Sequence, residues 1–195
     1  MIKENKYKQI YIVISQTGTI LSRILKLVTG AEYNHVSLAL SSDLESLYSF
    51  GRKHAYNPFF GGFVTESPNY GTFKRFYNTK VLVLAINVDS DRYSLMSKEI
   101  KNMLCEKSKY RYNYLGVCLA AFKICMSFNN RYYCSEFVKY FLQNFDIDGA
   151  CDLPKIPQPI HFLNIPYADL VYTGKLKDYK NFYLENLQSS NISYK

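Results

Sequence analysis

The sequence has no tryptophan, no long hydrophobic run and no run of four or more basic residues. A membrane-spanning helix needs about 18 to 20 consecutive apolar residues, and the closest stretch, from Leu115 to Phe128, is interrupted by Lys123. The N-terminal segment MIKENKYKQIYIVIS carries charge but lacks the apolar core and the small-residue cleavage site of a signal peptide. We therefore expect a cytoplasmic protein.

Motifs for metals and disulfides are also missing. The chain has five cysteines, an odd number without paired spacing, which favours a reducing compartment over a disulfide framework. No CxxC or HxxxH spacing occurs, so we expect no metal site and no cofactor.

The chain is rich in tyrosine and moderately basic. It has 19 Tyr and 13 Phe, and its formal net charge is +8. Tyrosines combine an apolar body with a polar tip, so they either fill the core or line a groove. The charge favours an anionic partner, such as an anionic membrane surface, but a solvated, mildly basic surface explains it better, because the basic residues are spread along the chain. Because the basic residues are dispersed and no nucleic-acid-binding motif is present, we expect no binding to nucleic acid.

Hydrophobic periodicity predicts a single α+β domain over residues 1–195, with a central antiparallel sheet packed by helices. A long loop is expected over 51–77, irregular structure over 151–160, and a polar tail over 178–195. The predicted strands are 8–15, 35–40, 46–50, 80–88 and 169–172, and the predicted helices are 19–30, 90–105, 114–128 and 134–145.

Cys134 stands where the aromatic segment Tyr132-Tyr133 leads into a predicted helix. A thiol in the first turn of a helix faces unpaired backbone N–H groups and the positive end of the helix dipole, and both favour the reactive thiolate. The backbone N–H of Cys134 is in addition a candidate donor to an oxyanion. The other four cysteines lack this setting, and Cys118 and Cys125 are expected to be small core residues.

His35 begins a predicted strand in which it shares one face with Ser37 and Ala39. These small neighbours leave the imidazole room to meet another element. A lone histidine is more often structural than catalytic, so the case for catalysis depends on its pairing with Cys134.

Three motifs in this order carry a family resemblance: TGTxxSR from Thr17, then YNHVSLAL around His35, then YYCSEFV around Cys134. The chain resembles the YiiX-like branch of the permuted NlpC-type cysteine hydrolases from about Ile10 to Ile160. The resemblance implies a circularly permuted papain-like fold, with the histidine strand before the cysteine helix. It also implies that Cys134 attacks a carbonyl and that His35 accepts the thiol proton, while a third polar residue orients the imidazole.

The third residue is expected on the strand that pairs with the strand of His35. Ser49 is the first candidate there and Tyr48 the alternative, although neither supplies a negative charge. Glu45, in the preceding turn, and Glu66, in the expected loop, are reserve candidates.

The turn formed by Thr17, Gly18 and Thr19 is a candidate substrate or anion site, because backbone N–H groups at a helix start bind anions. Plain helix capping explains the same residues. Gln16, directly before them, is a candidate oxyanion donor.

These features together predict a cysteine hydrolase or acyltransferase that acts on an amide or ester bond through a thioester. A small peptide and an acyl lipid are both open as substrates, and the sequence carries no signal for an oligomeric state. The alternative is a catalytically degenerate module that binds an anionic lipid or peptide, and the missing carboxylate orienter is its main support.

Overall fold

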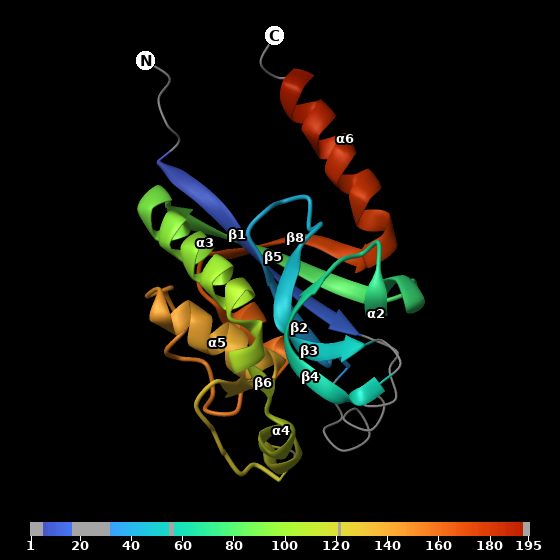
Figure 1. Cartoon of the computed structure of the whole chain (residues 1–195). Coiled ribbons are helices and arrows are strands. Elements are labelled where there is room, and N and C mark those ends of the chain that lie inside the picture. The colour runs from blue at the N-terminus through green and yellow to red at the C-terminus, as the bar shows by residue number, and fades with distance from the viewer. Residues whose placement is uncertain (1–5, 17–31, 55–56, 121, 193–195) are drawn as a thin grey trace.

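The computed structural model describes residues 6–16, 32–54, 57–120 and 122–192 (Figure 1). The predicted helix over 19–30 and the turn at Thr17, Gly18 and Thr19 lie outside these residues.

The described chain forms an α+β structure around a six-stranded sheet, as the sequence predicts (Figure 1). The strand order is β4-β3-β2-β1-β5-β8, and every neighbouring pair in this sheet is antiparallel. Alternating or fully apolar segments rich in Ile and Val form its central strands, because such residues pack well on a pleated surface. The strands are β1 (Tyr7–Gln16), β2 (His35–Ala39), β3 (Leu47–His54), β4 (Asn57–Glu66), β5 (Lys80–Asp89) and β8 (Ala168–Lys175).

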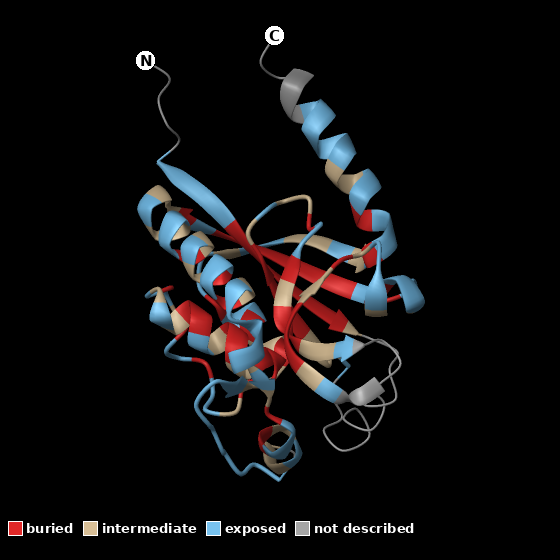
Figure 2. Cartoon of the chain, in the orientation of Figure 1, coloured by how far each residue is buried: buried red, intermediate tan, exposed pale blue. Residues whose placement is uncertain are grey.

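Each face of the sheet carries its own hydrophobic cluster, because successive side chains of a strand point to opposite faces. On one face, Ile12 and Ile14 belong to a cluster that also includes residues of α3 (Ser90–Cys105) and α5 (Cys134–Asn144). On the other face, Val13 packs with residues of α2 (Gly71–Arg75) and the first residue of α6 (Tyr179–Ile192). Figure 2 shows the buried residues concentrated along the central strands and on the sheet side of α3 and α5.

The predicted loop over 51–77 is wrong. β3 continues to His54, and β4 returns beside it as an antiparallel hairpin. The glycines that favour a loop here have a packing reason instead: a Cβ on Gly61 would lie 2.7 Å from Tyr112 Cβ, and one on Gly62 would lie 2.6 Å from the Tyr110 carbonyl oxygen. Glycine in a strand thus allows a neighbouring segment to approach closely.

The predicted helix over 114–128 is also wrong, because α4 covers only Tyr114–Ala120. It ends in a Schellman-type arrangement, in which the Ile124 N–H donates to the Leu119 carbonyl and the Lys123 N–H to the Ala120 carbonyl. Lys123 has the left-handed backbone conformation that this arrangement needs, with φ of 62°. The apolar residues that follow leave the helix and are exposed.

The remaining predicted strands and helices within the described residues agree with the structure within a few residues. Asp89 caps α3 by accepting a hydrogen bond from the Arg92 N–H at 2.8 Å. None of the helices within the described residues is long and apolar enough to cross a membrane. The short elements are η1 (Lys107–Lys109), the parallel pair β6 (Arg111–Tyr112) and β7 (Arg131–Tyr132), η2 (Pro159–Asn164) and η3 (Leu176–Asp178).

Candidate active site

Cys134 is the first residue of α5, as predicted, and only 7% of its surface is exposed. The helix is fixed by core residues on one side, including Phe137 and Phe141, and it packs against β2 and β3. The other four cysteines are exposed. The expectation that Cys118 and Cys125 are core residues is therefore wrong: Cys118 lies in α4 but is exposed there, and Cys125 follows the end of that helix at Ala120.

His35 is the first residue of β2, and it is held by a carboxylate. Its Nε2 atom lies 2.8 Å from Oε2 of Glu66, and the two side chains are only 12% and 14% exposed. The Ser37 hydroxyl, on the same face of β2, donates to the same Glu66 oxygen at 2.8 Å. The carboxylate is thus positioned by two residues of β2, and in turn it fixes the ring of His35.

The structure brings Cys134 and His35 together, although they lie far apart in the sequence. The Cys134 thiol is close enough to the His35 imidazole to raise the pKa of that ring. Because Nε2 of His35 faces Glu66, Nδ1 is the ring nitrogen left for the thiol. Sulfur, imidazole and carboxylate therefore lie together, on α5, β2 and β4.

The charges of this group support one another. Burial alone lowers the pKa of His35, but the Glu66 carboxylate and the hydrogen bonds to Cys134 and Glu66 outweigh it and raise that pKa well above its ordinary value. Burial alone raises the pKa of Glu66, whereas the charge and hydrogen bond of His35, followed by Ser37 and Arg52, lower it. The pair therefore favours an imidazolium beside a carboxylate.

Glu66, not Ser49 or Tyr48, lies against the His35 imidazole. The Ser49 hydroxyl donates to the backbone carbonyl of Val36 at 2.7 Å, and Tyr48 stacks on Phe63. The first-choice candidates are therefore engaged elsewhere, and the reserve candidate takes their position. The sequence places Glu66 in a loop, and only the β3–β4 hairpin, which pairs Leu47 with Glu66, moves it next to β2.

Tyr112 is a site residue that the sequence analysis missed. Burial, and next the nearby Cys134, raise the pKa of Tyr112 well above its ordinary value, so its hydroxyl stays protonated. It belongs to β6, which approaches β4 closely at Gly61. The available signal was the pair of glycines at 61–62, since a strand glycine marks the close approach of another backbone.

Gln16 ends β1 directly after Ser15, the residue that pairs with His35. Strand alternation gives it the same face as Ile12 and Ile14, which pack with the cysteine helix. Gln16 stays a candidate oxyanion donor. Thr17, Gly18 and Thr19 lie outside the described residues.

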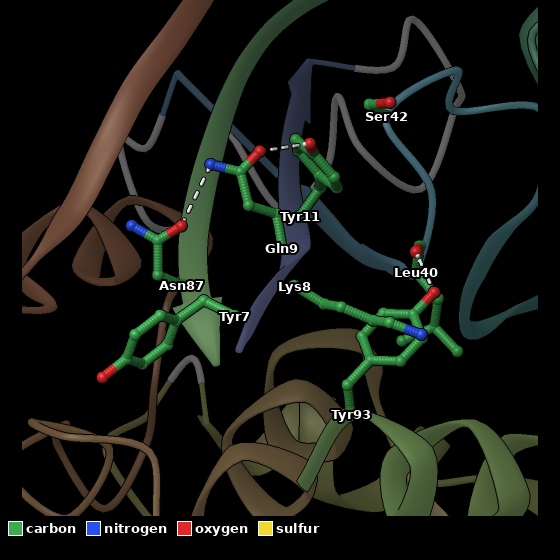
Figure 3. A pocket seen from close by; sticks show the side chains of 8 residues that line it. All are labelled: Tyr7, Lys8, Gln9, Tyr11, Leu40, Ser42, Asn87 and Tyr93. Carbon is green, nitrogen blue, oxygen red and sulfur yellow. Dashed lines mark hydrogen bonds between the residues drawn. The ribbon is translucent and has the colours of Figure 1, made fainter. Parts of the chain in front are cut away.

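A separate pocket of about 730 Å³ lies at the other end of β1 (Figure 3). Its polar groups largely bond to one another or to the backbone: Tyr11 donates to Gln9, Gln9 donates to Asn87, and Tyr93 donates to the Leu40 carbonyl. It contains no cysteine, histidine or carboxylate. The chemistry predicted from the sequence is therefore not located in this pocket.

Within the described parts of the chain, no three or more His, Cys, Asp and Glu side chains are grouped so that they would hold a metal ion. Comparison with protein-family models, with curated proteins and with solved structures finds no match to this chain. The function is therefore inferred from the geometry of the site itself.

Proposed function

We propose that this chain is a cysteine hydrolase or acyltransferase with a circularly permuted papain-like fold. The observation that carries the proposal is that the His35 imidazole lies 2.8 Å from the Glu66 carboxylate and close enough to the Cys134 thiol for the thiol to raise the pKa of the ring. Nucleophile, base and orienting acid in hydrogen-bond contact are the arrangement by which enzymes activate a thiol. The start of α5 adds unpaired backbone N–H groups at the same point.

In the proposed reaction, Cys134 Sγ attacks the carbonyl carbon of an amide or ester, while His35 holds the thiol proton. The backbone N–H of Cys134 and the Tyr112 hydroxyl are the candidate donors to the oxyanion, with Gln16 as a third. His35 then gives its proton to the leaving amine or alcohol as the C–N or C–O bond breaks, which leaves a thioester on Cys134. Water, or an acceptor amine or alcohol, attacks this thioester, returns a proton to His35 and releases the free thiol.

Glu66 also favours the enzyme over the degenerate binding module. The case for a module depended on the lack of a carboxylate to orient His35. Glu66 lies 2.8 Å from Nε2 and is supported by Ser37, and a binding module has no need of a carboxylate buried against a histidine.

Site-resolved alkylation tests the proposal sharply, because Cys134 is buried and the other four cysteines are exposed. Accessibility alone predicts that Cys134 reacts last with iodoacetamide. At about pH 6 ordinary thiols are almost fully protonated and therefore react slowly. In the proposed mechanism His35 holds the proton of Cys134, so we expect Cys134 to react first of the five cysteines. Peptide mass spectrometry measures the rate at each cysteine. His35→Ala should slow its alkylation at least about tenfold.

His161→Ala is the matched histidine control, because the Nδ1 atom of His161 in η2 accepts a hydrogen bond from the N–H of Gln158, the residue that precedes η2. It should leave the Cys134 rate unchanged. Incubation with p-nitrophenyl acetate should also acetylate Cys134 in wild type. In Cys134→Ala, no residue should be acetylated at a comparable rate. If Cys134 reacts no faster than the exposed cysteines and forms no acyl-enzyme, the proposal is wrong.

A further inference from the structure

The segment between α4 and β7 exposes a row of large apolar side chains. We call residues 122–128 the apolar loop. Phe122 is 74% exposed, and the other three members are between 38% and 50% exposed: Ile124, Met126 and Phe128. Leu115 on the neighbouring helix α4 is 54% exposed as well. Clustered exposure of this kind marks an interaction surface, since scattered single residues are the normal case.

The apolar loop is held in a defined arrangement. The exposed apolar residues occupy alternate positions, and the residues between them bond back to the protein. Ser127 donates to Glu136 at 2.7 Å, and Cys125 Sγ lies 4.0 Å from the Lys155 carbonyl oxygen. Asn113 donates from its side-chain amide to the Met126 carbonyl at 3.0 Å. The loop is thus anchored on one side and presents its apolar side chains on the other.

The charge around the apolar loop is mainly positive, although Glu136 accepts a hydrogen bond from Ser127 and Glu106 pairs with Lys109. Residues 107–135 contain no Asp or Glu, and the cations of this stretch are all exposed: Lys107, Lys109, Arg111, Lys123 and Arg131. The Arg131 guanidinium lies over the Phe128 ring at 5.9 Å. Apolar side chains surrounded by Lys and Arg are the pattern by which proteins enter the interface of an anionic bilayer.

We infer that the apolar loop docks the protein on an anionic phospholipid surface, with Phe122, Ile124, Met126 and Phe128 inserted below the headgroups. The loop lies at one end of the molecule, at the bottom of Figure 1, far from α6 and both termini. Figure 2 shows it as exposed. It continues through β7 into Cys134, so docking places the start of α5 close to the lipid surface. This inference stands without the proposed function, because it needs no reaction at Cys134.

The test is sedimentation of the full chain with two kinds of vesicle: pure phosphatidylcholine, and phosphatidylcholine with about 30 mol% phosphatidylglycerol. Wild type should bind the anionic vesicles preferentially, and raising the salt from about 0.1 M to about 1 M should weaken binding. Phe122→Ser with Ile124→Ser should weaken it at least about tenfold. Lys123→Gln should weaken it about fivefold on anionic vesicles only.

Leu184→Ser with Leu187→Ser is the matched control, because these residues of α6 are 45% and 43% exposed and lie outside the apolar loop. It should bind as wild type does, and so should Cys134→Ala. Failure of wild type to bind anionic vesicles overturns the inference, and so does equal binding by the double loop variant. A dimer that the loop variant abolishes, without vesicle binding, would assign the loop to a second copy and also overturn it.

Discussion

The carboxylate of Glu66 is charged and nearly buried, so its position in the site needs a physical explanation. It accepts hydrogen bonds from both His35 and Ser37 through one oxygen, Oε2. Burying a carboxylate costs free energy unless partners compensate. Both donors, His35 and Ser37, lie on β2, so this strand fixes the position of the carboxylate beside the imidazole.

We predict that Glu66→Gln slows the alkylation of Cys134 at about pH 6 by at least about tenfold, although its shape is almost unchanged. The amide carries no charge to stabilise an imidazolium at His35, and the proposed mechanism needs this imidazolium beside the Cys134 sulfur. Alkylation rates of single peptides measure the effect. Glu45→Gln is the control, because Glu45 is an exposed residue of the preceding turn. Equal rates in Glu66→Gln and wild type would show that Glu66 does not serve His35.

At this scale the sequence was sufficient for two members of the site. The positions of Cys134 at a helix start and His35 at a strand start follow from local pattern. Glu66 and Tyr112 do not, because both reach the site through contacts between segments that are distant along the chain. A carboxylate can be recognised in a sequence, but its partner is set by strand register, which here depends on a hairpin between β3 and β4.

At the scale of elements, Asn113 joins three segments around the start of α5. Its side-chain oxygen accepts from the Gly116 N–H at 2.8 Å in α4, and its amide donates to the Met126 carbonyl and to Glu136 of α5. Asn113 is buried, and Gly116 packs so tightly on it that an added Cβ would lie 2.1 Å from its amide nitrogen. One side chain thus fixes α4, the apolar loop and the cysteine helix relative to one another.

We predict that Asn113→Ala lowers the free energy of unfolding by about 1 to 3 kcal/mol, because it leaves the buried Gly116 N–H without its partner. Urea unfolding measures this loss. Asn102→Ala is the control: Asn102 makes one exposed hydrogen bond, to Glu99 at 3.3 Å, and its removal should cost less than about 0.5 kcal/mol. Equal losses in the two variants would exclude the joining role of Asn113.

In two segments the structure differs from the one that the local sequence pattern predicts. The segment around Gly61 and Gly62 has the composition of a loop, yet it is a strand, because the glycines admit β6 and its tyrosine. The segment after Ala120 has the composition of a buried helix, yet its side chains face solvent. Apolar composition predicts burial only against a partner within the chain. The inferred lipid surface is a partner that the chain does not contain.

At the scale of the whole molecule, His35 and Glu66 make the stability of the fold depend on pH. The pKa of His35 in the fold lies well above 6.5, so protonated His35 stabilises the fold fully below pH 6.5 and loses this effect as the pH rises through the folded value. The pKa of Glu66 lies below 4.5, so ionised Glu66 stabilises the fold fully above pH 4.5 and loses this effect as the pH falls through its folded value. Both contributions are complete only between these two limits.

We therefore predict that the stability of wild type relative to His35→Gln with Glu66→Gln is greatest between pH 4.5 and 6.5 and declines on either side. Urea unfolding of both proteins from about pH 3 to about pH 9 measures the difference, and its pH dependence is informative even though the two glutamines change the absolute stability. His161→Gln with Glu45→Gln removes the same two residue types from positions that do not contact each other, and should give a nearly flat difference. A flat difference for the His35 and Glu66 variant as well would mean that the two side chains do not form an ion pair in solution. The orienting role of Glu66 would then have no electrostatic basis, because a neutral pair would leave His35 with an ordinary affinity for its proton.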